Sequence, residues 1–326
     1  LWSKNLDFGY FSKPPFLAWS ISVYTYVFGD SFVSLKLFPS IVYILIAWAI
    51  YKLSINIGVD KNSSISCSLI FLLMPAVTFS SFIISTDLFL LLFWTLSLNE
   101  LIKIQTNPKF KNFILLGVFL GMGFLSKYAA IYFIICFFVY VIVDKSFRKF
   151  FFKNYIGFFV SICCVLIIIF PNVVWNFNNS WVTLSHTSDN ANFDNIKIDF
   201  TRGFVFLFIQ ILMIGPFLFL GSIVNFKEFN NNKYHKILLT FSLPVLLIVF
   251  IEAVIVRANA NWAAPALISL FLFIFAYCRN RIFKNLNFIF NFSFSIIFFI
   301  LIGLNYNSNI FNRIKGLDSF AHNVYF

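Results

Sequence analysis

Long apolar stretches separated by short polar segments run through almost the whole chain. A helix needs about 20 apolar residues to cross a membrane, and ten stretches approach or reach this length. A shorter apolar stretch, Pro15–Phe28, predicts an interfacial helix. The pattern therefore predicts an all-α, polytopic transmembrane helical bundle. Its expected spans are Lys36–Leu53, Ser64–Ser80, Thr86–Ile102, Asn112–Leu125, Tyr128–Val143, Tyr155–Trp175, Gly203–Asn225, Ile237–Val256, Trp262–Cys278 and Leu286–Leu304.

Composition supports a membrane protein. Hydrophobic residues make up 60% of the chain, charged residues 11%, and the mean hydropathy is +0.89. A soluble domain is about half apolar and about a quarter charged, so this chain has too much apolar surface to hide from water. The five cysteines lie within or at the ends of apolar runs without metal-ligand spacing. We interpret them as small core residues, not as redox or zinc sites.

The net charge of +12 does not indicate nucleic-acid binding, because lysine and arginine in loops orient a membrane protein. The most basic connections, around Lys103–Lys111 and Asp144–Asn154, are predicted to be cytoplasmic by this rule. The opening stretch and a long polar loop, Pro171–Gly203, are then expected on the outer side. For a bacterial protein this means the cytoplasmic (inner) membrane, with the outer loops in the periplasm.

Four charged residues are expected at the outer membrane surface: Lys13, Asp87, Lys127 and Arg257. Each has an ordinary alternative, since Asp87 suits the first turn of a helix, Lys127 suits an interfacial anchor, and Arg257, with Glu252 as its partner, suits a helix C-terminus. Charges in this position are costly and are usually functional. Three cations and one carboxylate at one depth suit an anionic ligand at the lipid–water boundary, and a lipid phosphate is the natural candidate.

Five motifs are spread over nearly the whole chain: GYFSKPPFLAW (Gly9–Trp19), STDLFLLLFW (Ser85–Trp94), GFLSKYAA (Gly123–Ala130), FPNVVWNFNNSWVTLSH (Phe170–His186) and NWAAPA (Asn261–Ala266). With these motifs in this order, the sequence resembles the polytopic GT-C glycosyltransferases of the protein O-mannosyltransferase-like branch, which includes the lipid A aminoarabinose transferases.

The resemblance implies a membrane glycosyltransferase that moves a sugar from a polyprenyl-phosphate donor to a lipid, glycan or protein acceptor by single displacement. It implies that Lys13 and Lys127 contact the donor phosphate and that Asp87 faces the active-site cavity. We assign Asp87 a catalytic role, either as an auxiliary base or in orienting the acceptor. We add Arg257 to the phosphate-binding cations. The residues expected to bind sugar or acceptor are Tyr10, His186, Asn261 and Trp262.

The sequence departs from the family pattern in two places. Relatives carry an acid or a histidine-like group before the lysine, where this chain has Ser12, which weakens the case for a divalent metal; no metal ligand is assigned. The principal acid of the family precedes the position that matches Leu1. We therefore expect residues 1–326 to form one GT-C-like transmembrane domain that lacks the first transmembrane helix and the start of the first outer loop, and with it the main catalytic acid.

Two other classes of protein remain open. A lipid-linked-sugar flippase or secondary transporter is compatible with ten helices, but such proteins place their charges near the membrane midplane. A structural assembly partner explains neither the outer cations nor the outer loop.

Overall fold

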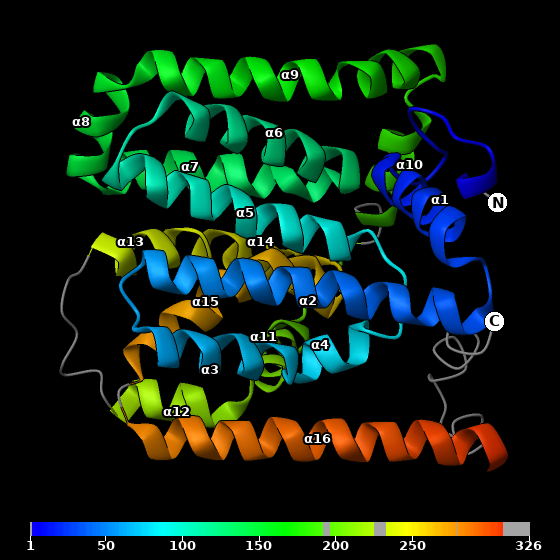
Figure 1. Ribbon diagram of the computed structural model, residues 1–326, viewed down its shortest axis with the longest axis vertical. Coiled ribbons are helices and arrows are strands. Elements are labelled where there is room, and N and C mark those ends of the chain that lie inside the picture. Colours follow the sequence, from blue (N-terminus) through cyan, green and yellow to red (C-terminus); the bar gives the residue numbers. More distant parts are fainter. Residues whose placement is uncertain (1, 192–195, 225–232, 279, 309–326) are drawn as a thin grey trace.

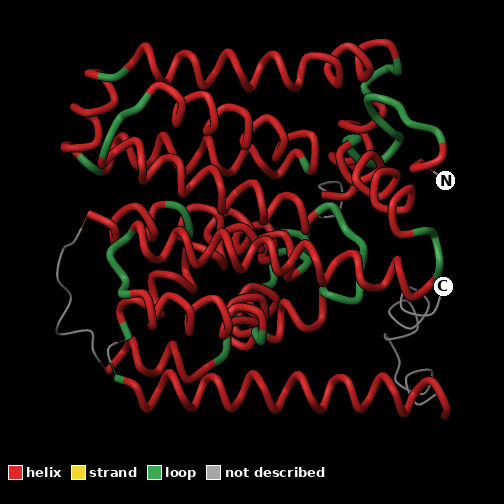
Figure 2. Tube along the Cα trace, in the orientation of Figure 1, coloured by secondary structure: helices red, strands yellow, loops and turns green. Residues whose placement is uncertain are grey.

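The computed structural model describes residues 2–191, 196–224, 233–278 and 280–308 (Figure 1). Helices account for the regular structure of these ranges, which contain no strand (Figure 2). This confirms the all-α prediction. The α-helices are α1 (Phe16–Phe28), α2 (Phe32–Asn56), α3 (Lys61–Leu72), α4 (Pro75–Ser80), α5 (Asp87–Thr106), α6 (Phe110–Ser126), α7 (Ile131–Val143), α8 (Lys145–Lys153), α9 (Tyr155–Asn178), α10 (Val182–Ala191), α11 (Phe200–Ile214), α12 (Pro216–Val224), α13 (Lys233–Thr240), α14 (Leu243–Ile255), α15 (Ala264–Tyr277) and α16 (Arg281–Ser308).

Helix α5 lies in the middle of the bundle, while α9 and α16 form its opposite edges (Figure 1). Helix α5 packs against α2, α6 and α15 and is buried around its whole circumference. An all-round apolar helix belongs in such a position. Because α5 is central, its first residue, Asp87, is held at one end of the bundle by neighbours on several sides.

By length and composition, five described helical segments are apolar enough to cross a membrane unbroken, and seven if two bent pairs are counted as spans. The expected number of about ten is higher. All ten predicted segments contain helix, but several are shorter than a bilayer or broken. The unbroken spans are Phe32–Asn56, Tyr155–Asn178, Tyr234–Ile255, Ala260–Tyr277 and Arg281–Ile302.

The predicted span Gly203–Asn225 is not one straight helix. It divides into α11 and α12, whose axes meet at 95°. Gly215 has a φ of 111°, which favours glycine, and Pro216 follows it without an N–H. The Ile214 carbonyl at this break accepts a hydrogen bond from the Asn291 amide of α16 (3.2 Å). A polar side chain from another helix thus satisfies the backbone of the break inside an apolar environment.

The predicted span Ser64–Ser80 is broken in a similar way. Helix α3 ends at Leu72, and α4 starts at Pro75. After the break, the Thr78 hydroxyl of α4 and the Ser295 hydroxyl of α16 lie 2.7 Å apart and form a hydrogen bond. Apolar residues flank both breaks, so hydropathy alone reads each as continuous.

Two segments predicted as loops contain helices. The basic connection after α7 forms α8, which turns by 109° from α7; the Asp144 carboxylate caps it by accepting from the Phe147 N–H (2.7 Å). The polar segment Pro171–Gly203 contains the end of α9 and the whole of α10. The turn between them places Ser180 and Trp181 at positive φ, so the chain reverses there and α10 folds back toward the N-terminal segment.

Helices α6 and α9 pack closely through two glycines one turn apart. A Cβ on Gly117 would lie 2.7 Å from the Cβ of Cys164, and one on Gly121 would lie 2.9 Å from side-chain atoms of Ile168. Small residues at this spacing let helix backbones approach each other inside a membrane, where the hydrophobic effect does not drive helix association. This contact fixes α6, which ends at Ser126, directly before Lys127.

Candidate functional site

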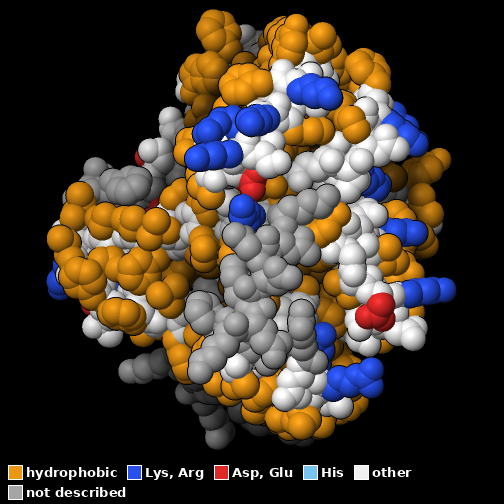
Figure 3. All heavy atoms as spheres, turned by 90° about the vertical axis from the view of Figure 1, so that its left-hand side faces the viewer, with side chains coloured by type: hydrophobic (Ala, Val, Ile, Leu, Met, Phe, Trp, Pro, Cys, Tyr) orange, Lys and Arg blue, Asp and Glu red, His pale blue; other side chains and the backbone are white. Residues whose placement is uncertain are grey.

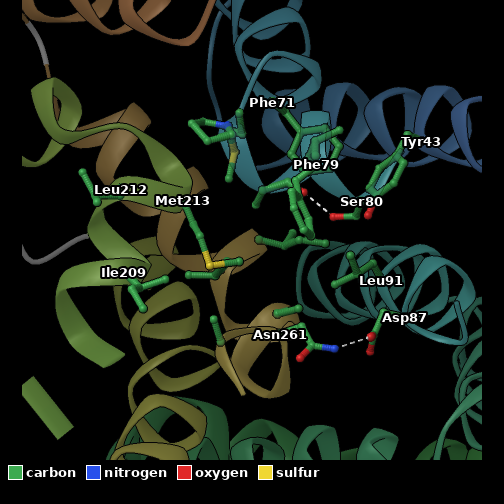
Figure 4. Close-up of a pocket in the computed structure, with 18 of the residues that line it drawn as sticks. Tyr43, Phe71, Phe79, Ser80, Asp87, Leu91, Ile209, Leu212, Met213 and Asn261 are labelled. Carbon is green, nitrogen blue, oxygen red and sulfur yellow. Dashed lines mark hydrogen bonds between the residues drawn. The ribbon is translucent and has the colours of Figure 1, made fainter. Parts of the chain in front are cut away.

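Four residues that are far apart in the sequence meet at the N-terminal end of α5. One Asp87 carboxylate oxygen accepts a hydrogen bond from the Lys127 ammonium (2.6 Å), and the other accepts from the Asn261 amide (2.9 Å; Figure 4). Lys13 is close enough for its charge to interact with those of Asp87 and Lys127. The cluster contains two cations, one carboxylate and one amide, three of them predicted from sequence as charges at this surface.

Asp87 is the first residue of α5, and its neighbour Thr86 occupies the N-cap position without a side-chain cap hydrogen bond. A carboxylate here is stabilised by the positive end of the helix dipole. Its side chain is only 13% exposed. Both carboxylate oxygens are bonded to other parts of the chain, so a helix-capping role does not account for its contacts.

Lys127 lies in the break between α6 and the 3-10 helix η2 (Tyr128–Ala130). Its backbone is extended (φ −159°, ψ 134°), and its N–H still donates to the Gly123 carbonyl (3.0 Å). The extended residue ends the helix and allows the side chain to reach Asp87. The lysine is thus paired within the protein and does not simply reach toward the membrane surface.

Lys13 lies in the segment before α1 and is about half-buried. Burial lowers the pKa of its ammonium, the nearby Lys127 lowers it further, and Asp87 partly opposes both effects. None of the ion pairs found in the described residues involves Lys13. It also borders a hollow of about 380 Å³ together with Trp2, Leu17 and Ile21. Because Asp87 already neutralises Lys127, Lys13 leaves the cluster with an uncompensated positive charge that suits an anion.

The segment that carries Lys13 is fixed to α9 and α10. The Asn172 amide donates to the Phe8 carbonyl (2.6 Å), the Thr183 hydroxyl donates to the Tyr10 carbonyl (2.6 Å), and the Trp175 indole donates to Asp7 (2.7 Å). These contacts give the polar motif of α9 and α10 a clear role. They hold the N-terminal segment against the bundle, and two prolines then start α1.

Asn261 belongs to the 3-10 helix η5 (Ala260–Ala263). The Gln210 amide of α11 donates to the Ala260 carbonyl (3.2 Å), and Gln210 is 3% exposed. Gln210 was not predicted as a site residue. A single glutamine inside the apolar run of α11 was the available signal, since buried polar groups among membrane helices are rare and usually have a partner.

An apolar cavity of about 610 Å³ opens beside the cluster (Figure 4). Its polar groups include Ser80, Ser85, Asp87, Asn261 and the phenol of Tyr43. Its body is lined by hydrocarbon side chains from α3, α4, α11, α15 and α16, among them Phe71, Phe79, Leu212, Met213, Leu267 and Phe294. The helix breaks described above shape this space. A mainly apolar cavity with a few polar groups on its wall suits an amphiphile.

The remaining predicted residues stay predictions. Tyr10 is buried, and its hydroxyl donates to the Asn5 carbonyl (3.1 Å) and accepts from the Asp7 N–H (3.0 Å). His186 of α10 packs against the Phe11 ring (5.0 Å between centroids). Trp262 packs against the core beside Asn261.

Arg257 is exposed in the segment before η5, and no described contact links it to Asp87. It also forms no ion pair with Glu252 in the described structure, so the expected pairing of these two residues is wrong. Among the described residues, no three His, Cys, Asp or Glu side chains are grouped to hold a metal ion. The residues present do not fit a metal site at Ser12.

Comparison with known proteins places this geometry in a family. The chain is 26% identical over 273 residues to the lipid A galacturonosyltransferase RgtD of Rhizobium johnstonii, covering 82% of this chain and 56% of the relative. It is 33% identical over 130 residues to the undecaprenyl phosphate-alpha-4-amino-4-deoxy-L-arabinose arabinosyl transferase of Wigglesworthia glossinidia brevipalpis, covering 37% of this chain and 22% of the relative. The chain thus spans about half the length of the first relative and less of the second.

The fold is similar to that of the crystal structure of ArnT from Cupriavidus metallidurans in the apo state. The TM-score is 0.59 at 14% identity, covering 82% of this chain and 49% of that chain. The sequence profile of the dolichyl-phosphate-mannose-protein mannosyltransferases matches residues 12–175, half of the chain. This range includes Lys13, Asp87 and Lys127. The chain therefore belongs to the dolichyl-phosphate-mannose-protein mannosyltransferase family.

Proposed function

We propose that the protein is a membrane glycosyltransferase that transfers a sugar from a polyprenyl-phosphate donor to a lipid acceptor. The observation that carries this proposal is the uncompensated, half-buried Lys13 ammonium next to the Asp87–Lys127 pair, beside a cavity with an apolar body. A prenyl phosphate has the matching chemistry, since its hydrocarbon chain suits the cavity and its phosphate suits the cations.

The donor sugar and the acceptor are proposed from the relatives alone. One relative is named for an undecaprenyl-phosphate-linked aminoarabinose, and another is named for transfer to lipid A. A phosphorylated glycolipid of the lipid A type is therefore our first choice of acceptor, ahead of a glycan or a protein.

The cluster is suited to a single displacement. The donor phosphate binds Lys13 and competes with Asp87 for the Lys127 ammonium. An acceptor hydroxyl or amine attacks the anomeric carbon, the bond from that carbon to the phosphate oxygen breaks, and the phosphate keeps the electron pair. The two ammonium groups stabilise the charge that develops on the leaving group. Asp87, released from Lys127 and oriented by Asn261, takes the proton from the acceptor.

The side of the membrane follows from the charge distribution. Lysine and arginine side chains gather at the end of the bundle opposite Asp87, and Figure 3 views the molecule from this end. The positive-inside rule makes this end cytoplasmic. We propose that the Asp87 cluster faces the periplasm of a bacterial inner membrane.

A transfer assay tests this function. Membranes from cells that express the whole gene receive radiolabelled polyprenyl-phosphate sugars, and the labelled acceptor is extracted and identified. We expect transfer by the native protein and its loss in Lys13→Ala and Asp87→Asn, with Lys109→Ala at the opposite end as a matched control. Native activity in both site variants would refute the assignment. Movement of labelled lipid between leaflets without transfer would favour a flippase.

A further inference from the structure

A second charged feature lies at the end of the bundle opposite Asp87, on the short helix α8. Its nine residues include four cations, Lys145, Arg148, Lys149 and Lys153, and no acid. The side chain of the neighbouring acid, Asp144, is 8% exposed and already has partners within the protein. It caps α8 and forms an ion pair with Lys236 (3.3 Å). The four cations of α8 form no ion pair with any described carboxylate.

The two faces of α8 have different chemistry. One face carries Phe147, Phe150 and Phe151 and packs into the protein. The Phe147 ring stacks on Tyr140 with centroids 4.3 Å apart, and the Phe151 ring lies 5.1 Å from that of Phe158. This aromatic packing fixes the helix to α7 and α9, so the position of its other face is determined.

The other face carries Lys145, Arg148 and Lys149, at helix positions i, i+3 and i+4. Side chains with this spacing lie next to each other on a helix surface. Phe152 follows one turn later and is 65% exposed. Beyond it, at the start of α9, Tyr155 and Ile156 are 62% and 61% exposed. A group of three cations therefore lies directly beside an exposed apolar strip.

The direction of α8 places this group at a membrane surface. Taken together, α7 and α8 are long and apolar enough to cross a membrane, but their helix axes meet at 109°. If α7 crosses the bilayer, α8 must run nearly along its surface. Cations at this level lie among lipid headgroups, and the apolar strip lies among the first carbons of the acyl chains.

We propose that the outward face of α8 is a binding site for anionic phospholipids of the leaflet opposite the Asp87 cluster. Lys145, Arg148 and Lys149 bind the phosphate of the headgroup, and Phe152 contacts the acyl chains. Charge complementarity selects this occupant, because a zwitterionic headgroup offers the cations no net negative charge. The site is separate from the proposed transferase site and does not depend on that activity.

Spin-labelled lipids test the proposal. The whole protein is reconstituted in phosphatidylcholine vesicles that contain a trace of spin-labelled phosphatidylglycerol or phosphatidylcholine, and the motionally restricted fraction of each label is measured. Each basic residue near a membrane surface strengthens attraction to anionic lipid several-fold. We expect restricted phosphatidylglycerol to exceed phosphatidylcholine by roughly tenfold for the native protein.

The triple variant Lys145→Gln, Arg148→Gln, Lys149→Gln should reduce this preference to less than about twofold. The matched control neutralises three exposed lysines outside α8 at the same end: Lys61→Gln, Lys109→Gln, Lys111→Gln. It should keep most of the preference. The conserving variant Lys145→Arg, Arg148→Lys, Lys149→Arg should keep it as well, which separates loss of charge from loss of folding.

If the triple variant does not insert in the membrane, the single variants Arg148→Gln and Lys149→Gln replace it. Each should lower the preference by roughly two- to threefold. A triple or single variant that keeps the full preference would overturn the proposal. So would an equal loss in the control, because the binding would then belong to the whole basic end and not to α8.

Discussion

Helix α5 carries two carboxylate–lysine pairs, one near each end, and both have a nitrogen–oxygen distance of 2.6 Å. In the first, Asp87 binds Lys127, which lies forty residues away in the sequence. In the second, Glu100 binds Lys103 within the same helix, at i and i+3. Distance alone does not distinguish them.

The surroundings of the two ion pairs distinguish them. The Lys127 side chain is 21% exposed, a third chain segment supplies Asn261, and the second cation Lys13 lies nearby without a carboxylate of its own. The Lys103 side chain is 40% exposed, Glu100 is 5% exposed, and the described ion pairs give Lys103 only this local partner. A pair made from distant segments beside an uncompensated charge is organised for a ligand. A local pair within one helix adds little to its stability, and here the Lys103 ammonium stays in contact with water while Glu100 is buried.

The largest effect expected from this comparison is that of Asp87→Asn. The amide cannot take a proton from the acceptor, so transfer should fall by about 10²- to 10⁴-fold. The rate of radiolabel transfer in membranes measures it. Glu100→Gln on the same helix is the control and should leave transfer within about twofold of native, since it lies far from the reacting groups. Equal losses in both variants would remove the functional distinction between the two pairs.

The second-largest effect is expected for Lys13→Ala, with a loss of about 10²-fold in kcat/KM. The variant removes the cation that binds the donor phosphate, and Lys127 remains occupied by Asp87. Steady-state kinetics with the donor varied would measure the loss. Lys109→Ala serves as the control, because Lys109 is an exposed lysine at the opposite end. An unchanged kcat/KM in Lys13→Ala would show that the donor phosphate binds elsewhere.

The dependence on pH sharpens the same point. Burial and Lys127 lower the pKa of Lys13 in the free protein, and only its protonated form binds phosphate strongly. Donor affinity should therefore decrease as pH rises through this lowered pKa, at a lower pH than for an ordinary lysine. In Lys13→Arg this decrease should disappear, since the guanidinium stays charged. Donor binding at several pH values measures it, and identical profiles for both proteins would contradict the assignment.

Gln210→Leu should have a smaller effect, roughly tenfold on transfer, because Gln210 touches no reacting group. It holds the Ala260 carbonyl (3.2 Å) and thereby the turn that carries Asn261. In the Asp87→Asn background, Gln210→Leu should reduce transfer only slightly further, since Asn261 then has no carboxylate to orient. Full additivity of the two losses would mean that Gln210 acts on general stability and not on the position of Asn261.

The smallest effect concerns stability at the basic end. Glu100→Gln breaks the local pair with Lys103 and should change the free energy of unfolding by less than about 1 kcal/mol, because the amide keeps the shape of the buried carboxylate and the 40% exposed Lys103 ammonium stays hydrated. Gly117→Val should cost more, about 1–3 kcal/mol, because its side chain would meet the α9 backbone. Thermal unfolding in detergent compares the two. A larger loss in Glu100→Gln would show that the local pair is structurally important.

Sequence by itself determined the membrane class and the helical segments, and it predicted that Lys13, Asp87 and Lys127 lie at one level of the bundle. Long apolar runs leave a chain no other stable environment, and the motifs around these residues are local. The family match to residues 12–175 confirms the family resemblance that these motifs indicated.

Tertiary structure alone decided which of these charges meet, and how the cavity beside them is shaped. Asp87 binds Asn261 across 174 residues, and no local pattern contains such a contact. The helix breaks before Pro75 and at Gly215 do not appear in the hydropathy pattern. Lipid and protein interior are both apolar, so hydropathy cannot distinguish a straight span from a bent one. The partner of Gln210, the cavity and the orientation of α8 depend on these long-range contacts and became visible only in the folded chain.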